Sequence, residues 1–298
     1  MRQKYSDCKF TAKSLLLINK INGIIDDYPG YNLTLRQIYY QLVATGDIEN
    51  TMRNYKKIGN VVNKARLAGL IDWDKIADRT RNCAGRDNFF TTPKNVIINA
   101  AEQFRLGRWF NQPNYLEVWV EKDAQIDTVA RACFDTDTVQ FSCRGYCSQT
   151  AMREAAQRFI YECEYGRDCH LLYCGDFDPS GLDMRRDIAD RLKFFGAIVD
   201  IRFIALTDTQ IQEFKPPTNP AKITDSRAKK FIADYGEYSW ELDALPPRYI
   251  EHLIKAEIDT FIDRNILTKT LQLEAAMRSD FQFIAGNYDE IVDNFKAG

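Results

Sequence analysis

Four short apolar runs alternate with segments of helical spacing between residues 115 and 206, and this alternation restricts the possible folds more than any other feature of the chain. Each run is typical of a buried or half-buried strand. The runs cover residues 115–120, 138–142, 170–173 and 199–206. Strands that alternate with helices build a mostly parallel sheet covered on both faces, and ligands gather at the carboxyl ends of its strands. We therefore predict an α/β fold for this part of the chain.

Acidic residues follow two of these predicted strands. Glu121 comes directly after the first run, and Asp176 and Asp178 come just after the third. Side chains alternate along a strand, so a strand that ends in Asp-x-Asp directs both carboxylates to the same side. Carboxylate oxygens are ligands that Mg²⁺ prefers. The sequence predicts a site for one or two Mg²⁺ ions at Glu121, Asp176 and Asp178, and helix capping is the alternative for a single Asp.

The residues around these acids resemble a known family. Residues 120–124 read Val-Glu-Lys-Asp-Ala, residues 176–184 read Asp-Phe-Asp-Pro-Ser-Gly-Leu-Asp-Met, and residues 241–245 read Glu-Leu-Asp-Ala-Leu. A Glu after one strand and Asp-x-Asp after a later one resemble the Toprim domain of topoisomerases, primases and some nucleases. The three phrases are similar to the A subunit of topoisomerase VI, which is related to the transesterase that makes meiotic double-strand breaks. The resemblance implies a CAP-like winged-helix DNA-binding domain followed by a Toprim domain.

The same resemblance extends to a tyrosine near the amino terminus. The family carries its nucleophile at the end of the pattern Arg-(Asp/Glu)-(Ile/Leu)-(Tyr/Phe)-Tyr. This chain has Arg36-Gln37-Ile38-Tyr39-Tyr40, with Gln37 in place of the usual acid. The match implies that Tyr40 is the nucleophile, with Tyr39 as the reserve candidate, and that Arg36 and Glu121 share in catalysis.

The local chemistry of this helix also favours Tyr40. Thr34 is a good N-cap, and Arg36 and Tyr40 are four residues apart and thus on one helix face. A tyrosine has a pKa of about 10, and a neighbouring guanidinium favours its phenolate and binds phosphate. Tyr39 is expected to pack inward. With 15 Tyr and 18 Phe in the chain, ordinary aromatic packing is the alternative for both.

The next segment fits a DNA-binding helix. Helical spacing runs from about residue 51 to residue 70, and an extended segment is expected at residues 69–73. A helix, a turn, a basic helix and an extended segment make a winged helix-turn-helix, whose second helix enters the major groove. A solvated basic face is the alternative. The outward residues, which we predict to bind double-stranded DNA, are Arg53, Lys57, Asn60 and Lys64.

Charge divides the chain into two parts. Residues 1–113 contain 18 of the 40 Lys and Arg residues but only 10 of the 42 Asp and Glu residues. A basic first part suits phosphate binding, and an acidic second part suits metal binding. We predict a winged-helix domain at residues 1–110, including a helix at 94–106, and a Toprim domain with a helical extension at residues 111–298.

The expected surroundings are the cytoplasm or the nucleoid. No signal segment or membrane-spanning run is evident, and the eight cysteines show no disulfide pattern, so free thiols are expected. The chain resembles the compact relatives called topo mini-A, which implies activity without an ATPase B subunit. In the family the tyrosine of one protomer works with the acids of the other, so a homodimer is implied.

These observations lead to one functional expectation and two alternatives. The chain is expected to be a type IIB topoisomerase-like transesterase that cleaves double-stranded DNA through a 5′-phosphotyrosyl intermediate. A Toprim nuclease that uses water as nucleophile is the first alternative. The second is a catalytically silent DNA-binding regulator.

Overall fold

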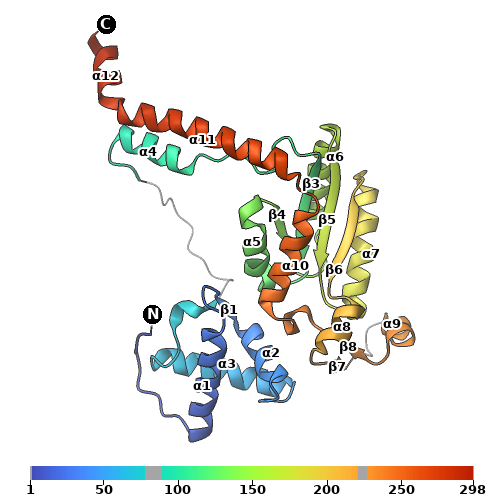
Figure 1. Ribbon diagram of the computed structural model, residues 1–298. Coiled ribbons are helices and arrows are strands. Elements are labelled where there is room, and N and C mark those ends of the chain that lie inside the picture. Colours follow the sequence, from blue (N-terminus) through green and yellow to red (C-terminus); the bar gives the residue numbers. More distant parts are fainter. Residues whose placement is uncertain (1, 78–88, 221–226, 298) are drawn as a thin grey trace.

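The structure is a computed structural model, and it describes residues 2–77, 89–220 and 227–297 (Figure 1). Two groups of elements are visible, an amino-terminal group of helices and a sheet covered by helices. The strands are β1 (Leu33–Thr34), β2 (Ile76–Ala77), β3 (Asn114–Val120), β4 (Val139–Ser142), β5 (Asp168–Cys174), β6 (Asp200–Ala205), β7 (Asn219–Pro220) and β8 (Tyr238–Ser239). The helices are α1 (Ala12–Asp26), α2 (Leu35–Ala44), α3 (Met52–Leu67), α4 (Pro93–Gln103), α5 (Ile126–Cys133), α6 (Gln149–Glu164), α7 (Pro179–Phe194), α8 (Asp208–Phe214), α9 (Ala228–Tyr235), α10 (Pro247–Asp259), α11 (Arg264–Gly286) and α12 (Tyr288–Ala297).

The main sheet has four parallel strands in the order β4-β3-β5-β6. The four predicted strands and the α/β class are therefore confirmed. The chain enters at β3, adds β4 on one side and then adds β5 on the other, so the strand order reverses between β3 and β5. In open α/β sheets such a switch point leaves a crevice at the carboxyl ends of the strands, and ligands bind there.

Both faces of this sheet are covered by helices. Strand side chains alternate, so Val118 and Leu172 join a core with α5 and α10, whereas Trp119 and Tyr173 join a second core with α6 and α7. Ser148 caps α6 by accepting a hydrogen bond from the Ala151 N–H. The two cores fix the ends of β3 and β5 firmly beside each other.

The amino-terminal group is built from α1, α2 and α3, which enclose their own core. Thr34 caps α2, and the side chain of Gln37 completes a capping box with it, which gives this glutamine a structural role. The extended segment predicted at 69–73 is wrong, because a turn and a 3₁₀ turn at Trp73–Lys75 precede β2. β2 pairs with β1 in parallel, and residues 2–77 contain no antiparallel wing hairpin.

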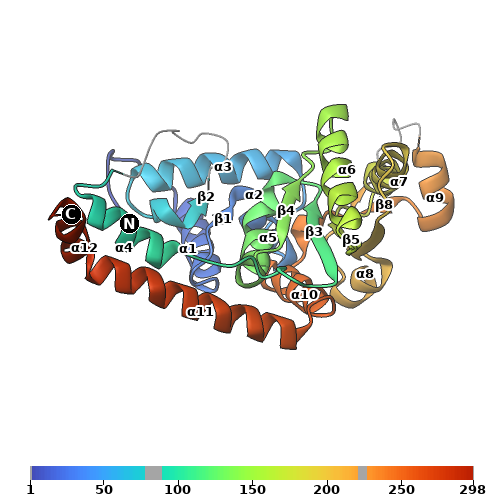
Figure 2. The same ribbon diagram turned by 90° about the horizontal axis from the view of Figure 1, so that it is seen from above.

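A helical arm completes the molecule. α4 packs along α11, and α12 continues beyond it (Figures 1 and 2). The buried side chains of Arg108 and Glu274 form an ion pair inside this arm. The helix predicted at 94–106 therefore packs with a carboxyl-terminal helix, although it lies before the predicted boundary at residues 110 and 111.

Candidate active site at the carboxyl edge of the sheet

Glu121 and Asp176 meet at the switch point of the sheet. Glu121 follows the last residue of β3, and Asp176 lies two residues beyond the end of β5. Both are buried, with 5% and 2% of their surface exposed. The backbone N–H of Asp176 donates a hydrogen bond of 2.8 Å to Glu121 Oε2. The expectation that these two acids share one sheet edge agrees with this arrangement.

Two glycines allow this close approach. A Cβ on Gly175 would lie 2.6 Å from Cε1 of Tyr173 and 2.9 Å from Oε2 of Glu121. A Cβ on Gly181 would lie 2.3 Å from the carbonyl oxygen of Asp176. None of these three distances is possible for a real Cβ atom, so a larger residue at either position would displace its neighbours.

Asp178 is placed differently from its prediction. β5 ends at Cys174, so strand alternation does not orient Asp176 and Asp178. Asp178 is instead the N-cap of α7, and its Oδ1 accepts a hydrogen bond of 2.6 Å from the Gly181 N–H. The argument from strand pleating was therefore wrong. The start of a helix sets the direction of this carboxylate.

Lys122 supplies a cation at the same edge. Its Nζ forms an ion pair with Asp176 and a second one of 3.2 Å with Glu241 Oε2. Burial alone would lower the pKa of Lys122, but the charges of Asp176 and Asp243 and the hydrogen bond from Lys122 to Asp176 raise it. Lys122 is thus a charged partner for the acids, a role that sequence reasoning missed.

The acidic edge still lacks charge balance at Glu121. Burial first, and then the neighbouring charge of Asp176, raise the pKa of Glu121 to about 8. A cation placed beside this carboxyl group would favour its charged form and lower this pKa.

Tyr40 and Arg36 share one face of α2, as predicted. The guanidinium carbon of Arg36 lies 5.8 Å from the centre of the Tyr40 ring. Arg36 also forms ion pairs with Glu241 and, at 2.8 Å, with Asp243. Burial raises the pKa of Tyr40 and outweighs the lowering by Arg36, so the net direction is opposite to the one expected from the sequence.

The two adjacent tyrosines differ in their hydroxyl contacts. Both rings are buried, with 3% of Tyr39 and 4% of Tyr40 exposed. The Tyr39 hydroxyl donates hydrogen bonds to Asn50 Oδ1 and the Thr51 carbonyl, at 3.0 and 3.1 Å. The Tyr40 hydroxyl accepts one long hydrogen bond of 3.4 Å from Asn219 Nδ2. The Tyr39 hydroxyl therefore has a clear structural role, whereas the Tyr40 hydroxyl is held more weakly.

A chain of polar contacts connects Tyr40 to the acidic edge. Asn219 Nδ2 lies within hydrogen-bonding distance of both the Tyr40 hydroxyl and Glu241 Oε1, and Glu241 in turn contacts Lys122. A second connection runs from Gln37 to Gln125 and on to Asp243. The only sequence signal for Glu241 and Asp243 was their place in the phrase at residues 241–245.

A cavity of about 280 Å³ lies beside Tyr40. Tyr39, Tyr55 and Met52 contribute its apolar lining, and Asn219 and Glu241 contribute polar groups. The Tyr40 hydroxyl is therefore reached through this cavity rather than from an open surface.

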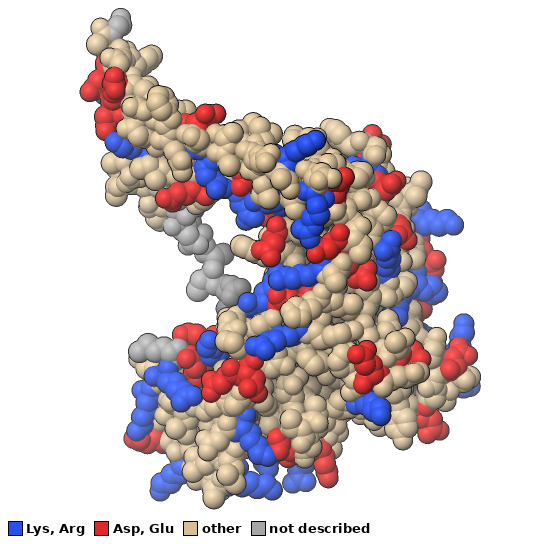
Figure 3. Space-filling view, viewed as in Figure 1, with Lys and Arg blue, Asp and Glu red and all other residues tan. Residues whose placement is uncertain are grey.

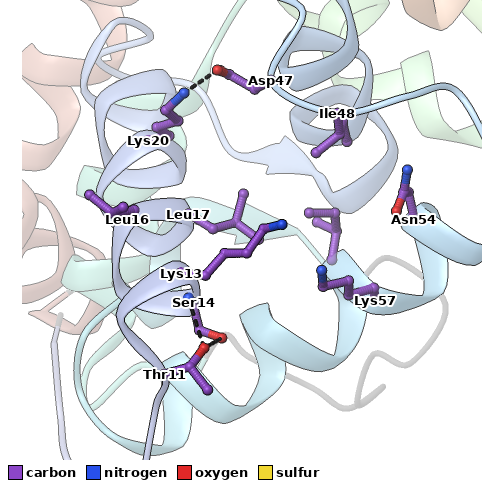
Figure 4. Close-up of a pocket in the computed structure, with 11 residues that line it drawn as sticks. Thr11, Lys13, Ser14, Leu16, Leu17, Lys20, Asp47, Ile48, Asn54 and Lys57 are labelled. Atoms are coloured by element: carbon purple, nitrogen blue, oxygen red, sulfur yellow. Dashed lines mark hydrogen bonds and ion pairs between the residues drawn. The ribbon is translucent and has the colours of Figure 1, made fainter.

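The predicted DNA-binding residues form one surface on α3. All four are exposed, and they line a shallow hollow together with Lys9 and Lys56. A neighbouring cavity of about 260 Å³ is lined by residues of α1 and α3, and Lys13 and Lys57 extend into it (Figure 4). Lys and Arg side chains also stand out over the amino-terminal part in Figure 3. The four residues are Arg53, Lys57, Asn60 and Lys64.

The fit of these residues to Mg²⁺ can be judged from their donors. Within the described ranges, no group of three or more His, Cys, Asp or Glu side chains has the arrangement of a metal site. Mg²⁺, however, is commonly held by one or two carboxylates together with waters and substrate phosphates. Glu121 and Asp176 fit that simpler donor set, whereas Asp178 caps a helix.

Comparison with known proteins gives no family for this chain: no model of a protein family, no curated protein and no solved structure matches it. Among the residues that the structure describes, no helix is both long and apolar enough to cross a membrane.

Proposed function

We propose that the protein is a metal-dependent DNA transesterase that resembles the A subunit of topoisomerase VI, with a winged-helix domain and a Toprim domain. One observation supports this most strongly. Asn219 contacts the Tyr40 hydroxyl and Glu241, and Glu241 contacts the Lys122 ammonium beside Asp176, so a candidate nucleophile and a buried acidic pair belong to one connected polar site. A sheet switch point with two carboxylates and an adjacent Arg-Tyr pair suits phosphoryl transfer better than histidine-based chemistry.

In the proposed reaction, the Tyr40 oxygen attacks a backbone phosphorus of DNA. The bond from phosphorus to the 3′ oxygen breaks, the tyrosine releases its proton, and the departing 3′ oxygen gains one. The products are a 5′ phosphate joined to Tyr40 and a free 3′ hydroxyl. Arg36 binds the phosphate through its guanidinium, which requires release of its pairs with Glu241 and Asp243.

Glu121 and Asp176 would hold Mg²⁺, which in such sites stabilises negative charge on the phosphate and the leaving oxygen. Lys122 positions Asp176 through its ion pair and is itself held by a second ion pair with Glu241. Arg53, Lys57, Asn60 and Lys64 bind the duplex beside the cut. We further propose a homodimer that makes two staggered nicks, in the cytoplasm or on the nucleoid, without an ATPase partner.

A nuclease that uses water is the second candidate. Its support is the burial of Tyr40, because a hydroxyl with a raised pKa and little exposure is a poor nucleophile in the conformation described. A catalytically silent regulator is the third candidate, and the Lys122 ammonium that neutralises Asp176 is the observation in its favour.

A denaturing gel with end-labelled duplex DNA separates these functions. The wild-type protein with Mg²⁺ should give a covalent adduct on 5′ ends, Tyr40→Phe should give neither adduct nor cleavage, and Tyr39→Phe should retain both at a reduced rate. Cleavage by Tyr40→Phe with free 5′ phosphates would support the nuclease. Absence of any cleavage by the wild-type protein with Mg²⁺ would support the regulator.

A further inference from the structure

The acidic edge contains a buried hydroxyl that has no hydrogen-bond partner among the residues that the structure describes. Tyr173 lies in the middle of the sheet on β5, and its side chain is fully buried. Its hydroxyl oxygen makes no hydrogen bond in the structure. A buried polar group without a partner costs free energy, so its presence requires a reason.

This hydroxyl lies beside Glu121. The position that a Cβ of Gly175 would occupy is 3.0 Å from the Tyr173 hydroxyl and 2.9 Å from Glu121 Oε2. The two oxygens therefore border the same small space, which exists because residue 175 is a glycine. Glu121 Oε2 accepts its hydrogen bond from the Asp176 N–H, and the Tyr173 donor stays unused.

The surroundings keep this hydroxyl protonated. Burial raises the pKa of Tyr173 strongly, and the charge of Glu121 adds to that effect. The hydroxyl is therefore a donor at neutral pH. The half-buried Arg185 acts electrostatically on both Tyr173 and Glu121.

We propose that Tyr173 is a positioning residue, whose hydroxyl donates a hydrogen bond to the Glu121 carboxylate when that carboxylate is charged and engaged with Mg²⁺. The inference rests on the proposed function, because it assigns Glu121 to the metal. Groups that hydrogen-bond to metal-binding carboxylates fix their orientation, and their loss weakens metal binding about 10- to 100-fold. An unused donor beside such a carboxylate is what this role requires before the metal binds.

A matched pair of variants tests the assignment. Tyr173→Phe removes an unpartnered buried hydroxyl, whereas Tyr115→Phe removes a buried hydroxyl that donates to Glu117 at 2.8 Å, near the opposite end of the sheet. Two quantities are measured for each: the urea midpoint of the metal-free protein, and Mg²⁺ affinity by calorimetry without DNA.

The expected results have opposite patterns. Tyr173→Phe should keep or raise the urea midpoint and bind Mg²⁺ about 10-fold more weakly. Tyr115→Phe should lower the midpoint and leave Mg²⁺ affinity unchanged. The inference is overturned if the wild-type protein binds Mg²⁺ and cuts DNA and the Tyr173→Phe variant binds Mg²⁺ equally tightly. A wild-type protein that binds no Mg²⁺ overturns both this inference and the proposed metal site.

Discussion

Asp176 and Asp178 are two residues apart and have very different surroundings. Asp176 is buried and paired with Lys122, whereas Asp178 caps α7. Asparagine is an equally good N-cap, so Asp178→Asn should keep the fold and retain part of the Mg²⁺-dependent cleavage.

Asp176→Asn should reduce cleavage by about 100-fold or more, because a metal ligand contributes several kcal/mol to the transition state. Cleavage rates at saturating Mg²⁺, together with DNA affinity as the control, check this pair. Equal and complete loss of cleavage in both variants would show that Asp178 is also a metal ligand. Normal cleavage by Asp176→Asn would show that Asp176 is not one.

Asp183 on α7 provides a pH test that is independent of function. The hydroxyl of Tyr146 donates to it at 2.5 Å, and this hydrogen bond, with those of Arg186 and Arg227, lowers the pKa of Asp183 from 3.8 to about 2. A lowered pKa means that its contribution to stability is present above about pH 4 and is lost as the pH falls towards 2.

Asp183→Asn should therefore lower the free energy of unfolding at pH 7 by at most about 2 kcal/mol, and the difference from wild type should shrink near pH 2. Urea unfolding at both pH values measures this. Asp190→Asn is the control, because Asp190 is an exposed acid of the same helix that also pairs with Arg186. A pH-independent difference for Asp183→Asn would contradict the assignment.

The start of a helix could be predicted from the sequence where a local capping signal marks it. Thr34 acts as the predicted N-cap of α2, because a hydroxyl that accepts a hydrogen bond from a backbone N–H is a short-range interaction. A second local signal separates α10 from α11. The first of these helices ends at Asp259, and Asp263 caps the second by accepting hydrogen bonds from the Asn265 and Ile266 N–H groups.

Only part of the candidate site could be predicted from the sequence, because its residues come from distant parts of the chain. The adjacency of Glu121 and Asp176 follows from strand ends that share an edge, which periodicity predicts. The contacts of Arg36 with Glu241, and of Asn219 with Tyr40, depend on how the amino-terminal helices dock on the sheet. No periodicity in the sequence encodes that docking.

The exposed face of α3 gives a prediction at the scale of one helix. Lys57 and Lys64 have no ion-pair partner among the described residues and line the same hollow. Lys57→Ala with Lys64→Ala should weaken DNA binding at every sequence and reduce the salt slope by about one to two units, because phosphate contacts are lost. Binding titrations at several salt concentrations measure the slope. Replacing Lys269 and Lys296, two exposed lysines of the arm, with alanine should leave the salt slope unchanged. An unchanged slope for both pairs of variants would mean that the exposed side of α3 is an ordinary solvated surface.

On the scale of the whole molecule, polar contacts join the amino-terminal helices to the sheet and its surrounding segments, and Ala244 from the segment before α10 also packs into the core of those helices. Arg36 pairs with Glu241, Gln37 bonds to Gln125, and Arg131 donates to the Gly30 carbonyl. Contacts between domains of this polar kind permit relative motion more readily than an apolar interface does. Such motion is needed by the proposed function, because Tyr40 is only 4% exposed where it is docked.

A mixing experiment decides whether Tyr40 acts on the acids of its own chain or on those of a partner. Tyr40 is buried beside a cavity where it is docked, and the proposed homodimer would bring it to the acids of a partner chain. We therefore expect two variants that are each inactive, Tyr40→Phe and Glu121→Gln, to recover cleavage when they are refolded together. In the mixed dimer, the tyrosine of one chain then meets the intact acids of the other.

At most one of the two sites in that mixed dimer is complete, so its cleavage should produce nicks rather than double-strand breaks. Supercoiled plasmid should thus become open circular and not linear, and a double variant, Tyr40→Phe with Glu121→Gln, mixed with Glu121→Gln serves as the control without a complete site. Linear product from wild type together with no nicking by the mixture would place Tyr40 and the acids of one chain in the same site, in line with the contacts through Asn219 and Glu241.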